Sequence, residues 1–207
     1  MISGVSLKHG AEYYFRIHRA KSKYLLVDEL KKLHYFIFDV LKSCPNDYFF
    51  EGPRSSVLKT AISVKLEKVE HEVKFFARMG LDSNYYGNAH LNVQMFMLAY
   101  DKRTVAIEVP IWISSDELEF YETIFNSTKP LSGHIDVVRV EDDCIWIWDY
   151  KPNAHREKFA CTQTFFYALM LSIRTGIPLE RFRCGYFDDK NVYCFKPSLD
   201  ILENFQI

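Results

Sequence analysis

The segment CIWIWDYK, residues 144–151, constrains the fold of this chain more than any other stretch. Alternate residues of a strand face opposite sides of a sheet, and here isoleucines occupy one side while tryptophans occupy the other. Because both faces are apolar, we expect a central strand whose sheet is covered by helices on both sides. The segment ends in Asp149 and Lys151, and two charges beside so apolar a strand are costly unless they are paired or used.

The segments around this strand predict an α/β fold. Residues 104–114 and 134–140 are rich in β-branched and aromatic residues, which favours two further strands. Residues 90–100 and 158–175 carry the composition and spacing of helices. Residues 182–196 predict a closing β-hairpin, and a short helix is expected to finish the chain.

The amino-terminal part is interpreted as helical. The first 60 residues contain apolar residues at helical spacing, and residues 55–79 are a second helical candidate that ends near Gly80. We therefore expect a helical extension over residues 1–80, packed on an α/β core over residues 81–207.

Composition restricts the class of protein. With 207 residues, of which 48% are hydrophobic, the chain can bury a substantial core and is too apolar to be disordered. It has no apolar run of the roughly 20 residues that span a bilayer, and its first residues lack the apolar stretch of a signal peptide. We expect no membrane association and a cytoplasmic location, or the host cytoplasm if the chain is viral. Its five cysteines form no CxxC pair, and their odd number indicates reduced thiols.

One region of the chain gathers side chains that suit hydrolysis of a phosphodiester. Asp136 lies among apolar neighbours, where a carboxylate needs a cation or hydrogen-bond donors. Asp149 and Lys151 share a strand face, and Gln163 and Tyr167 are four residues apart on one helix face. Two carboxylates can hold a hard divalent cation, and a lysine beside them can orient water or offset charge in the transition state.

This order of residues resembles the RecB-like branch of the PD-(D/E)XK nucleases. The shared pattern is a glycine three residues before an acid, a strand ending in acid-x-lysine, and a helix with Gln-x-x-x-Tyr. That branch includes helicase-linked exonucleases, CRISPR-associated nucleases and stand-alone nucleases of archaea and their viruses. The resemblance implies a restriction-endonuclease-like core, with a central mixed sheet flanked by helices, and metal-dependent hydrolysis of DNA in repair or recombination. It implies catalytic roles for Asp136, Asp149 and Lys151, with Mg²⁺ or Mn²⁺ bound by both acids, His90 and the backbone carbonyl of Tyr150.

The same resemblance selects His90 and Glu108. Many members place a glycine and then a histidine at the start of a helix ahead of the core strands, as Gly87 and His90 stand here. His71 and His134 remain alternatives for the metal-binding role. Glu108 occupies a position where relatives often have a glutamate on the first core strand, and its direction, and so its accessory role, is left open.

Two further sets of residues are expected to contact nucleic acid. In relatives the pair corresponding to Gln163 and Tyr167 contacts DNA or supports the metal ligands, although plain packing is the alternative for Tyr167. The net charge of −1 makes a local basic segment necessary, and residues 16–32 mix basic with aromatic side chains. The alternative for this segment is the solvated face of a helix. Its candidate nucleic-acid-binding residues are Arg16, Arg19, Lys21 and Lys23.

The substrate is expected to be DNA, and the lack of a recognisable helicase domain favours single-stranded DNA. Some relatives carry an iron–sulfur cluster on one upstream cysteine and a compact trio, but Cys161, Cys184 and Cys194 are widely spread, so no cluster is expected. Homo-oligomerisation is left open. The alternative function is a non-catalytic nucleic-acid-binding protein on the same fold, although the chain retains both acids and the lysine.

Overall fold

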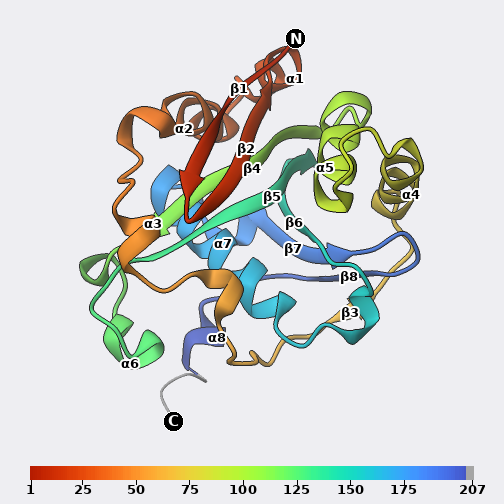
Figure 1. Ribbon diagram of the computed structural model, residues 1–207. Helices are drawn as coiled ribbons and strands as arrows, with labels where there is room; N and C mark the ends of the chain where they lie inside the picture. Colours follow the sequence, from red (N-terminus) through yellow and green to blue (C-terminus); the bar gives the residue numbers. More distant parts are fainter. Residues whose placement is uncertain (204–207) are drawn as a thin grey trace.

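The computed structural model describes residues 1–203, which contain one mixed sheet of eight strands (Figure 1). Across the sheet the order is β1-β2-β4-β5-β6-β7-β8-β3. Strands β6 and β7 are parallel, and every other neighbouring pair is antiparallel. The strands are β1 (Ile2–His9), β2 (Ala11–His18), β3 (Glu67–Lys68), β4 (Thr104–Ile113), β5 (Leu131–Glu141), β6 (Cys144–Tyr150), β7 (Phe182–Phe187) and β8 (Val192–Phe195).

Helices cover both faces of this sheet, so the expected α/β class is confirmed (Figure 1). The α-helices are α1 (Arg19–Ser22), α2 (Leu30–Ser43), α3 (Tyr48–Glu51), α4 (Val73–Ser83), α5 (Ala89–Tyr100), α6 (Tyr121–Phe125), α7 (Ala160–Thr175) and α8 (Asp200–Glu203). Short 3₁₀ helices are η1 (Lys23–Leu25), η2 (Ser55–Val57), η3 (Ser115–Glu117), η4 (Ala154–Arg156) and η5 (Leu179–Arg181). Within the described residues, no helix is both long and apolar enough to cross a bilayer.

Strand β6 is central, as its sequence predicts, and its two faces belong to two apolar clusters. Ile145 and Ile147 pack in the cluster that includes residues of α2 and α7. Trp148 and Tyr150 pack on the other side, with residues of α4 and α5. Burial on both faces fixes the register of β6, because a shift by one residue would exchange its two sets of side chains.

Two predicted chain reversals are confirmed. Asp142 and Asp143 connect β5 to β6, and their φ angles of 49° and 57° match a tight turn with two left-handed residues, which suits the twist of a hairpin. Gly176, with φ 64°, ends α7 and donates its backbone N–H to the carbonyl of Ser172.

The helical prediction for the first 18 residues is wrong. They form the hairpin β1–β2, with Gly10 at φ 83° in the turn, and β2 continues the sheet by pairing Arg16 with Ile107 of β4. Phe15 and Ile17 are buried two residues apart, which is the period of a strand. That alternation spans so few residues that the neighbouring helical pattern obscured it.

The helical prediction for residues 55–79 is wrong over residues 58–72. After η2, the chain runs in non-helical conformation to residue 72, with Ile62 and Val64 packed two residues apart on the main core. Gly80 does not end α4 but lies inside it. A Cβ atom at this position would stand 2.8 Å from the Cα of Val93, so glycine permits the close approach of α4 to α5.

Candidate active site

One acidic residue from each of three neighbouring strands lies in the same row across the sheet. Val137 of β5 pairs with Ile107 of β4 on one side and with Trp148 of β6 on the other. The neighbouring row of the sheet consists of the residue after Ile107, the residue before Val137 and the residue after Trp148. These three residues are the acids Glu108, Asp136 and Asp149. The sheet thus brings together three carboxylates that are far apart in the sequence.

These acids line a cavity of about 290 Å³. It contains the predicted residues His90 from α5, Lys151 after β6, and Gln163 and Tyr167 from α7, so the sheet and helices on both of its faces contribute to it. The complete lining is Glu12, Tyr13, Arg54, Ser56, His90, Glu108, His134, Asp136, Asp149, Lys151, Gln163 and Tyr167.

Lys151 is held in the cavity by a short chain of polar contacts. Its Nζ lies 2.8 Å from Oδ2 of Asp149 and donates to Oε1 of Gln163 at 2.9 Å. Gln163 in turn donates from Nε2 to the hydroxyl of Tyr167 at 2.9 Å. The predicted face of α7 therefore points into the cavity, and it positions the ammonium group of Lys151.

The carboxylate of Asp149 is buried with little compensation. Its side chain is 1% exposed, and the Lys151 ammonium 2.8 Å from Oδ2 is its charged partner, whereas Oδ1 has no donor among the described residues. Oε2 of Glu108 is also buried without a donor in the described chain. Buried oxygens that lack donors raise the free energy of the folded protein, and they are the atoms that a hard cation binds.

Two of these acids, Asp136 and Glu108, have a raised affinity for protons. Burial raises the pKa of Asp136 well above its usual value, and the charges of Asp149 and Glu108 raise it further. The backbone N–H of Tyr150, which donates to Oδ2 of Asp136 at 3.0 Å, acts in the opposite direction. Burial and the charge of Asp149 raise the pKa of Glu108 to about 7, although Gln94 donates to its Oε1 at 2.5 Å. A divalent cation would offset this repulsion between the carboxylates.

Glu108 points into the cavity from a strained backbone. Its φ of 50° is left-handed, a conformation that costs a non-glycine residue on the order of 1–3 kcal/mol and often marks a functional site. The sequence left its direction open because the strand around it is apolar on both faces. Gln94, which holds its carboxyl group, was missed; it lies one helical turn after His90 on α5, and that spacing was the available signal.

His90 lies in the first turn of α5, as predicted, and lines the cavity. The side chain of Asn88 caps this helix by accepting a hydrogen bond from the backbone N–H of Leu91. The His90 ring meets the Tyr150 ring edge-on, with centroids 5.0 Å apart. Burial lowers the pKa of His90, against the charge of Asp149, which favours the neutral form that binds metals.

The two alternative histidines have other partners. His71 lies outside the cavity lining, with Nε2 3.4 Å from Oε2 of Glu141. His134 lines the cavity but uses both ring nitrogens, one with His9 and one with Arg54. Of these three histidines, His90 lines the cavity without using both ring nitrogens on other side chains, so it remains the candidate for a cation.

Lys21 does not fit its predicted role as a phosphate contact. Its ammonium donates to the carbonyls of Leu98 and Asp101, each at 2.5 Å, at the end of α5. Burial lowers its pKa to about 8, although the charge of Asp101 opposes this. These contacts make Lys21 a clamp between α1 and the carboxyl end of α5.

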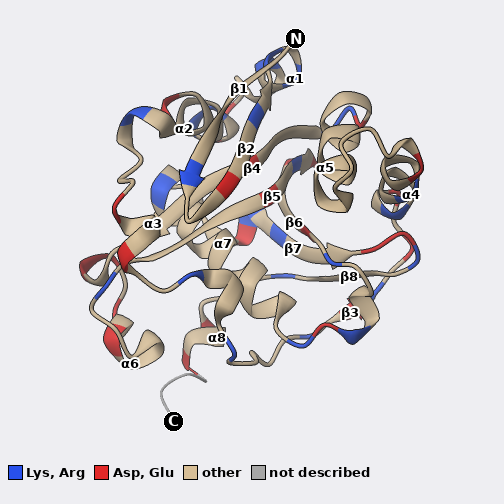
Figure 2. Cartoon of the chain, viewed as in Figure 1, with Lys and Arg blue, Asp and Glu red and all other residues tan. Residues whose placement is uncertain are grey.

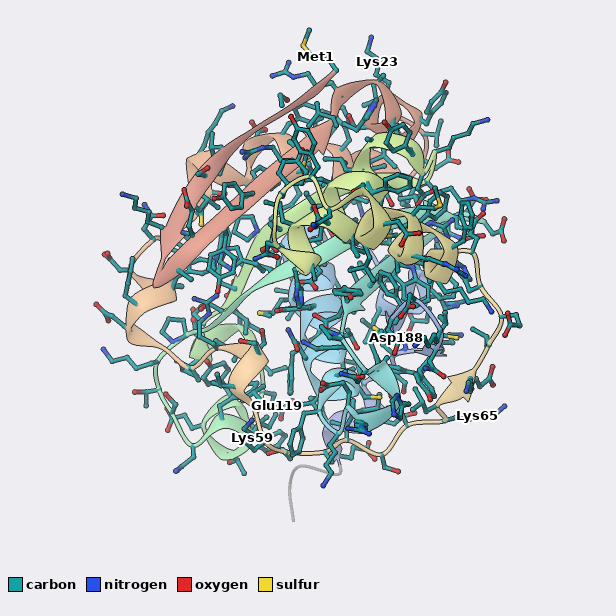
Figure 3. The ribbon with its side chains drawn as sticks, turned by 45° about the vertical axis from the view of Figure 1, so that its right-hand side comes forward. Met1, Lys23, Lys59, Lys65, Glu119 and Asp188 are labelled. Carbon is teal, nitrogen blue, oxygen red and sulfur yellow. The ribbon has the colours of Figure 1, made fainter. Side chains whose placement is uncertain are left out.

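The other three predicted basic residues also lie outside the cavity lining. Figure 2 shows the basic positions of α1 beside the amino terminus, and Lys23 extends into solvent next to Met1 in Figure 3. Arg16 donates to the carbonyl of Val5 at 2.6 Å, and Arg19 donates to a serine hydroxyl on β1. The structure therefore does not join this basic segment to the acidic row.

The residues fit a divalent cation by their chemistry, although no three His, Cys, Asp or Glu side chains within residues 1–203 already surround one point as ligands. The fit rests on Oδ1 of Asp149 and Oε2 of Glu108, which lack donors among the described residues, and on the burial and repulsion that hold the pKa of Asp136 high. Comparisons with protein-family models, curated proteins and solved structures give no match. The candidate site is therefore interpreted from its own geometry.

Proposed function

We propose that this protein is a metal-dependent nuclease of the RecB-like PD-(D/E)XK type, which hydrolyses phosphodiester bonds of DNA. The observation that carries the proposal is the row of Glu108, Asp136 and Asp149 in one cavity with Lys151. Three carboxylates in a row have no evident structural use, because burial together destabilises them. Binding of cations and a phosphate would explain why the three acids lie together.

The proposed ligands of Mg²⁺ or Mn²⁺ are the oxygens of Asp136 and Asp149, with His90, Glu108 and the backbone carbonyl of Tyr150 as further candidates. A bound divalent ion would polarise the scissile phosphate and lower the pKa of a water molecule, so that hydroxide is available near neutral pH. The protein contributes by holding these carboxylates in place, and the cation would favour their ionised forms. The hydrogen bond from the backbone of Tyr150 fixes the carboxyl group of Asp136.

Lys151 supplies a fixed positive charge in this proposal. Burial works against its protonated form, but the charges of Asp149 and Asp136 outweigh burial and keep the pKa of Lys151 above its usual value. Gln163 holds the ammonium through Oε1, and Tyr167 holds Gln163. A charge fixed in this way can orient the attacking water and stabilise negative charge as it develops on the phosphate.

A pocket lined by aromatic side chains of α5 and of the loop between α4 and α5 supports single-stranded DNA as the substrate. Tyr85 is 81% exposed and Tyr100 is 68% exposed, and both line a pocket of about 290 Å³ together with Tyr86 and Phe96. The side chain of Asn92 holds this loop by accepting from the backbone N–H of Tyr86 at 2.8 Å. Unpaired bases stack on exposed aromatic rings, and the loop leads directly into the helix that carries His90.

The proposal is tested by incubating the purified protein with labelled linear and circular DNA, single-stranded and double-stranded, with Mg²⁺ or Mn²⁺. We expect cleavage of single strands that a chelator abolishes and added Mn²⁺ restores. Asp149→Asn and Lys151→Gln, purified identically, should lose cleavage while still binding DNA. Binding without cleavage by the folded wild-type protein would support the non-catalytic alternative, and equal cleavage by all three proteins would reveal a contaminating enzyme.

A further inference from the structure

Arg54 reaches the acidic cavity from the loop before η2, and neutral groups hold it there. Its NH1 donates to the backbone carbonyl of His9 at 2.7 Å, and its NH2 donates to the hydroxyl of Tyr13 at 2.9 Å. NH2 also lies 3.1 Å from Nδ1 of His134. The guanidinium group is therefore fixed on the cavity wall by three contacts, none of which carries a negative charge.

The contact with His134 orders a chain of hydrogen bonds. Because arginine only donates, Nδ1 of His134 must accept, and the proton of its ring lies on Nε2. That proton is donated to Nδ1 of His9 at 2.9 Å, and Nε2 of His9 donates to Oδ1 of Asn46 at 3.0 Å. The ring of Tyr13 stacks on His134, with centroids 3.7 Å apart and planes inclined by 10°. Both histidines are neutral in this chain, and Arg54 is held rigidly at its end.

No acid of residues 1–203 lies within ion-pair distance of Arg54, although its charge acts on Glu108 of the same cavity and opposes the rise in the pKa of that carboxyl group. None of the ion pairs within residues 1–203 includes Arg54, and its Nε is buried without an acceptor in that part of the chain. Lys151, the other cation of the cavity lining, is by contrast paired with Asp149. Three of the five guanidinium N–H groups are used by the contacts with the protein. One N–H of NH1 and the buried Nε–H remain as donors for an anion.

We propose that Arg54 binds a phosphate of the nucleic-acid strand next to the one that is cleaved; this inference rests on the nuclease function proposed above. A nucleic-acid strand that enters the cavity brings its negative phosphates toward three carboxylates. Binding of the strand therefore requires a positive group that is not already in an ion pair with one of these acids. A guanidinium group binds phosphate oxygens through directed N–H groups, and its fixed position gives the strand a register. Arg54 would thereby decide which phosphodiester bond lies at the acidic row.

The inference is tested by binding of a short fluorescent oligodeoxythymidylate in the presence of a chelator, so that no cleavage is needed for the readout. We expect Arg54→Gln to weaken binding about tenfold or more, since a hydrogen bond to a charged group contributes about 1.5–3 kcal/mol. The slope of log affinity against log salt should fall by about 0.7, the value for one lost phosphate contact on a single strand. Arg183→Gln is the matched control, because Arg183 is also held by backbone carbonyls but lies outside this cavity, and its affinity should not change.

A set of oligonucleotides, each with one phosphate replaced by an uncharged methylphosphonate, locates the contact. One replacement should weaken binding to the wild type and have no further effect on Arg54→Gln, which is the signature of a direct pair in a double-mutant cycle. If Arg54→Gln does not fold, Arg54→Lys retains the charge without the planar donors and should keep the salt slope with weaker affinity. Equal affinity of Arg54→Gln and wild type, or an equal penalty at every replaced phosphate, would overturn the inference.

Cleavage of the same oligonucleotides with Mn²⁺ separates this inference from the nuclease proposal. Failure of the wild type to cleave any of them would contradict the nuclease function, whatever Arg54 does. Cleavage by the wild type, combined with unchanged binding and unchanged cleavage positions in Arg54→Gln, would contradict the role of Arg54 and leave the nuclease proposal standing. With Arg54 in its proposed role, the variant should cleave at less uniform positions along the strand.

Discussion

Strand β5 carries buried charges on both of its faces, and the two groups of charges differ in how they are compensated. On one face, Arg139 is fully buried and forms ion pairs with Asp101, Glu72 and Glu141. On the other face, Asp136 adjoins two further acids, and its pKa is raised well above the usual value by burial and by their charges. A balanced cluster and an unbalanced one therefore lie only three positions apart on one strand.

This difference in charge compensation distinguishes the roles that we propose for the two clusters. Around Arg139 the protein supplies every charge with an opposite charge or a hydrogen bond; Asp101, for example, also accepts from the hydroxyl of Thr104 at 2.6 Å. Around Asp136 the protein leaves carboxylate oxygens without donors. The cluster around Arg139 therefore needs no further partner, whereas we propose that the cluster around Asp136 gains its missing charge from a bound cation.

The largest expected effect is on the rate of cleavage, which should depend on Asp136 of the unbalanced cluster. Asp136→Asn should reduce single-turnover cleavage of single-stranded DNA on the order of a thousandfold or more, because a metal site supplies several kcal/mol to the transition state. The same change should raise the melting temperature slightly in the absence of metal, because it removes a buried charge next to two acids. A marked loss of stability would show that Asp136 is a structural residue.

Arg139→Met should have the opposite pattern. Removing one partner of a buried ion pair leaves uncompensated charge and costs about 3–5 kcal/mol, measurable by denaturant unfolding. Cleavage per folded molecule should stay at the wild-type level. Lys42→Gln is the control, because it breaks an exposed pair with Asp39 that is worth less than about 1 kcal/mol. Loss of cleavage in a folded Arg139→Met protein would contradict the division between the clusters.

The stability of the acidic cluster should depend on pH. The pKa of Glu108 is raised from 4.5 to about 7, so the contribution of Glu108 to stability is greatest below pH 4.5 and is lost as the pH rises through about 7. Glu108→Gln should therefore stabilise the metal-free protein more at pH 8 than at pH 5, by on the order of 1–3 kcal/mol. Added Mn²⁺ should diminish this difference, because a cation favours the ionised carboxylates. Thermal melts of both proteins across this pH range provide the measurement.

The smallest effect is expected at Lys21. Lys21→Met removes the clamp on the carbonyls of Leu98 and Asp101, which should cost about 1 kcal/mol or less of stability. Its affinity for single-stranded DNA should equal that of the wild type, in contrast to Arg54→Gln. A loss of affinity that exceeds the loss seen for Arg54→Gln would move the nucleic-acid path from the cavity wall to the amino-terminal segment.

The part of the fold that the sequence predicts best is the part with long, uninterrupted patterns. The alternation of isoleucine and tryptophan in residues 144–151 predicts a central strand because it records burial on both faces. Phe15 and Ile17 carry the same signal over too few residues to outweigh the helical pattern that follows, so the hairpin β1–β2 was missed. Residues 58–72 have little regular structure of their own, and their packing is decided by contacts with the rest of the molecule.

The candidate site likewise contains some residues that the sequence predicts and others that it does not. Asp136, Asp149 and Lys151 were identified by spacing, because strand period and order are visible in the sequence. Arg54 was not, since the loop that carries it has no pattern and reaches the cavity through contacts with distant residues. The direction of Glu108 could not be predicted either, because it depends on a left-handed backbone conformation that a glutamate seldom adopts.

Calorimetric titration with Mn²⁺ tests the central claim most directly, with wild type, Asp136→Asn and Arg139→Met compared under identical conditions. If the unbalanced cluster is a cation site, the wild type and Arg139→Met should bind Mn²⁺, and Asp136→Asn should bind it far more weakly or not at all. Both variants alter β5, so the comparison controls for general effects on the strand. Absence of Mn²⁺ binding by folded wild-type protein, or equal binding by wild type and Asp136→Asn, would contradict the account.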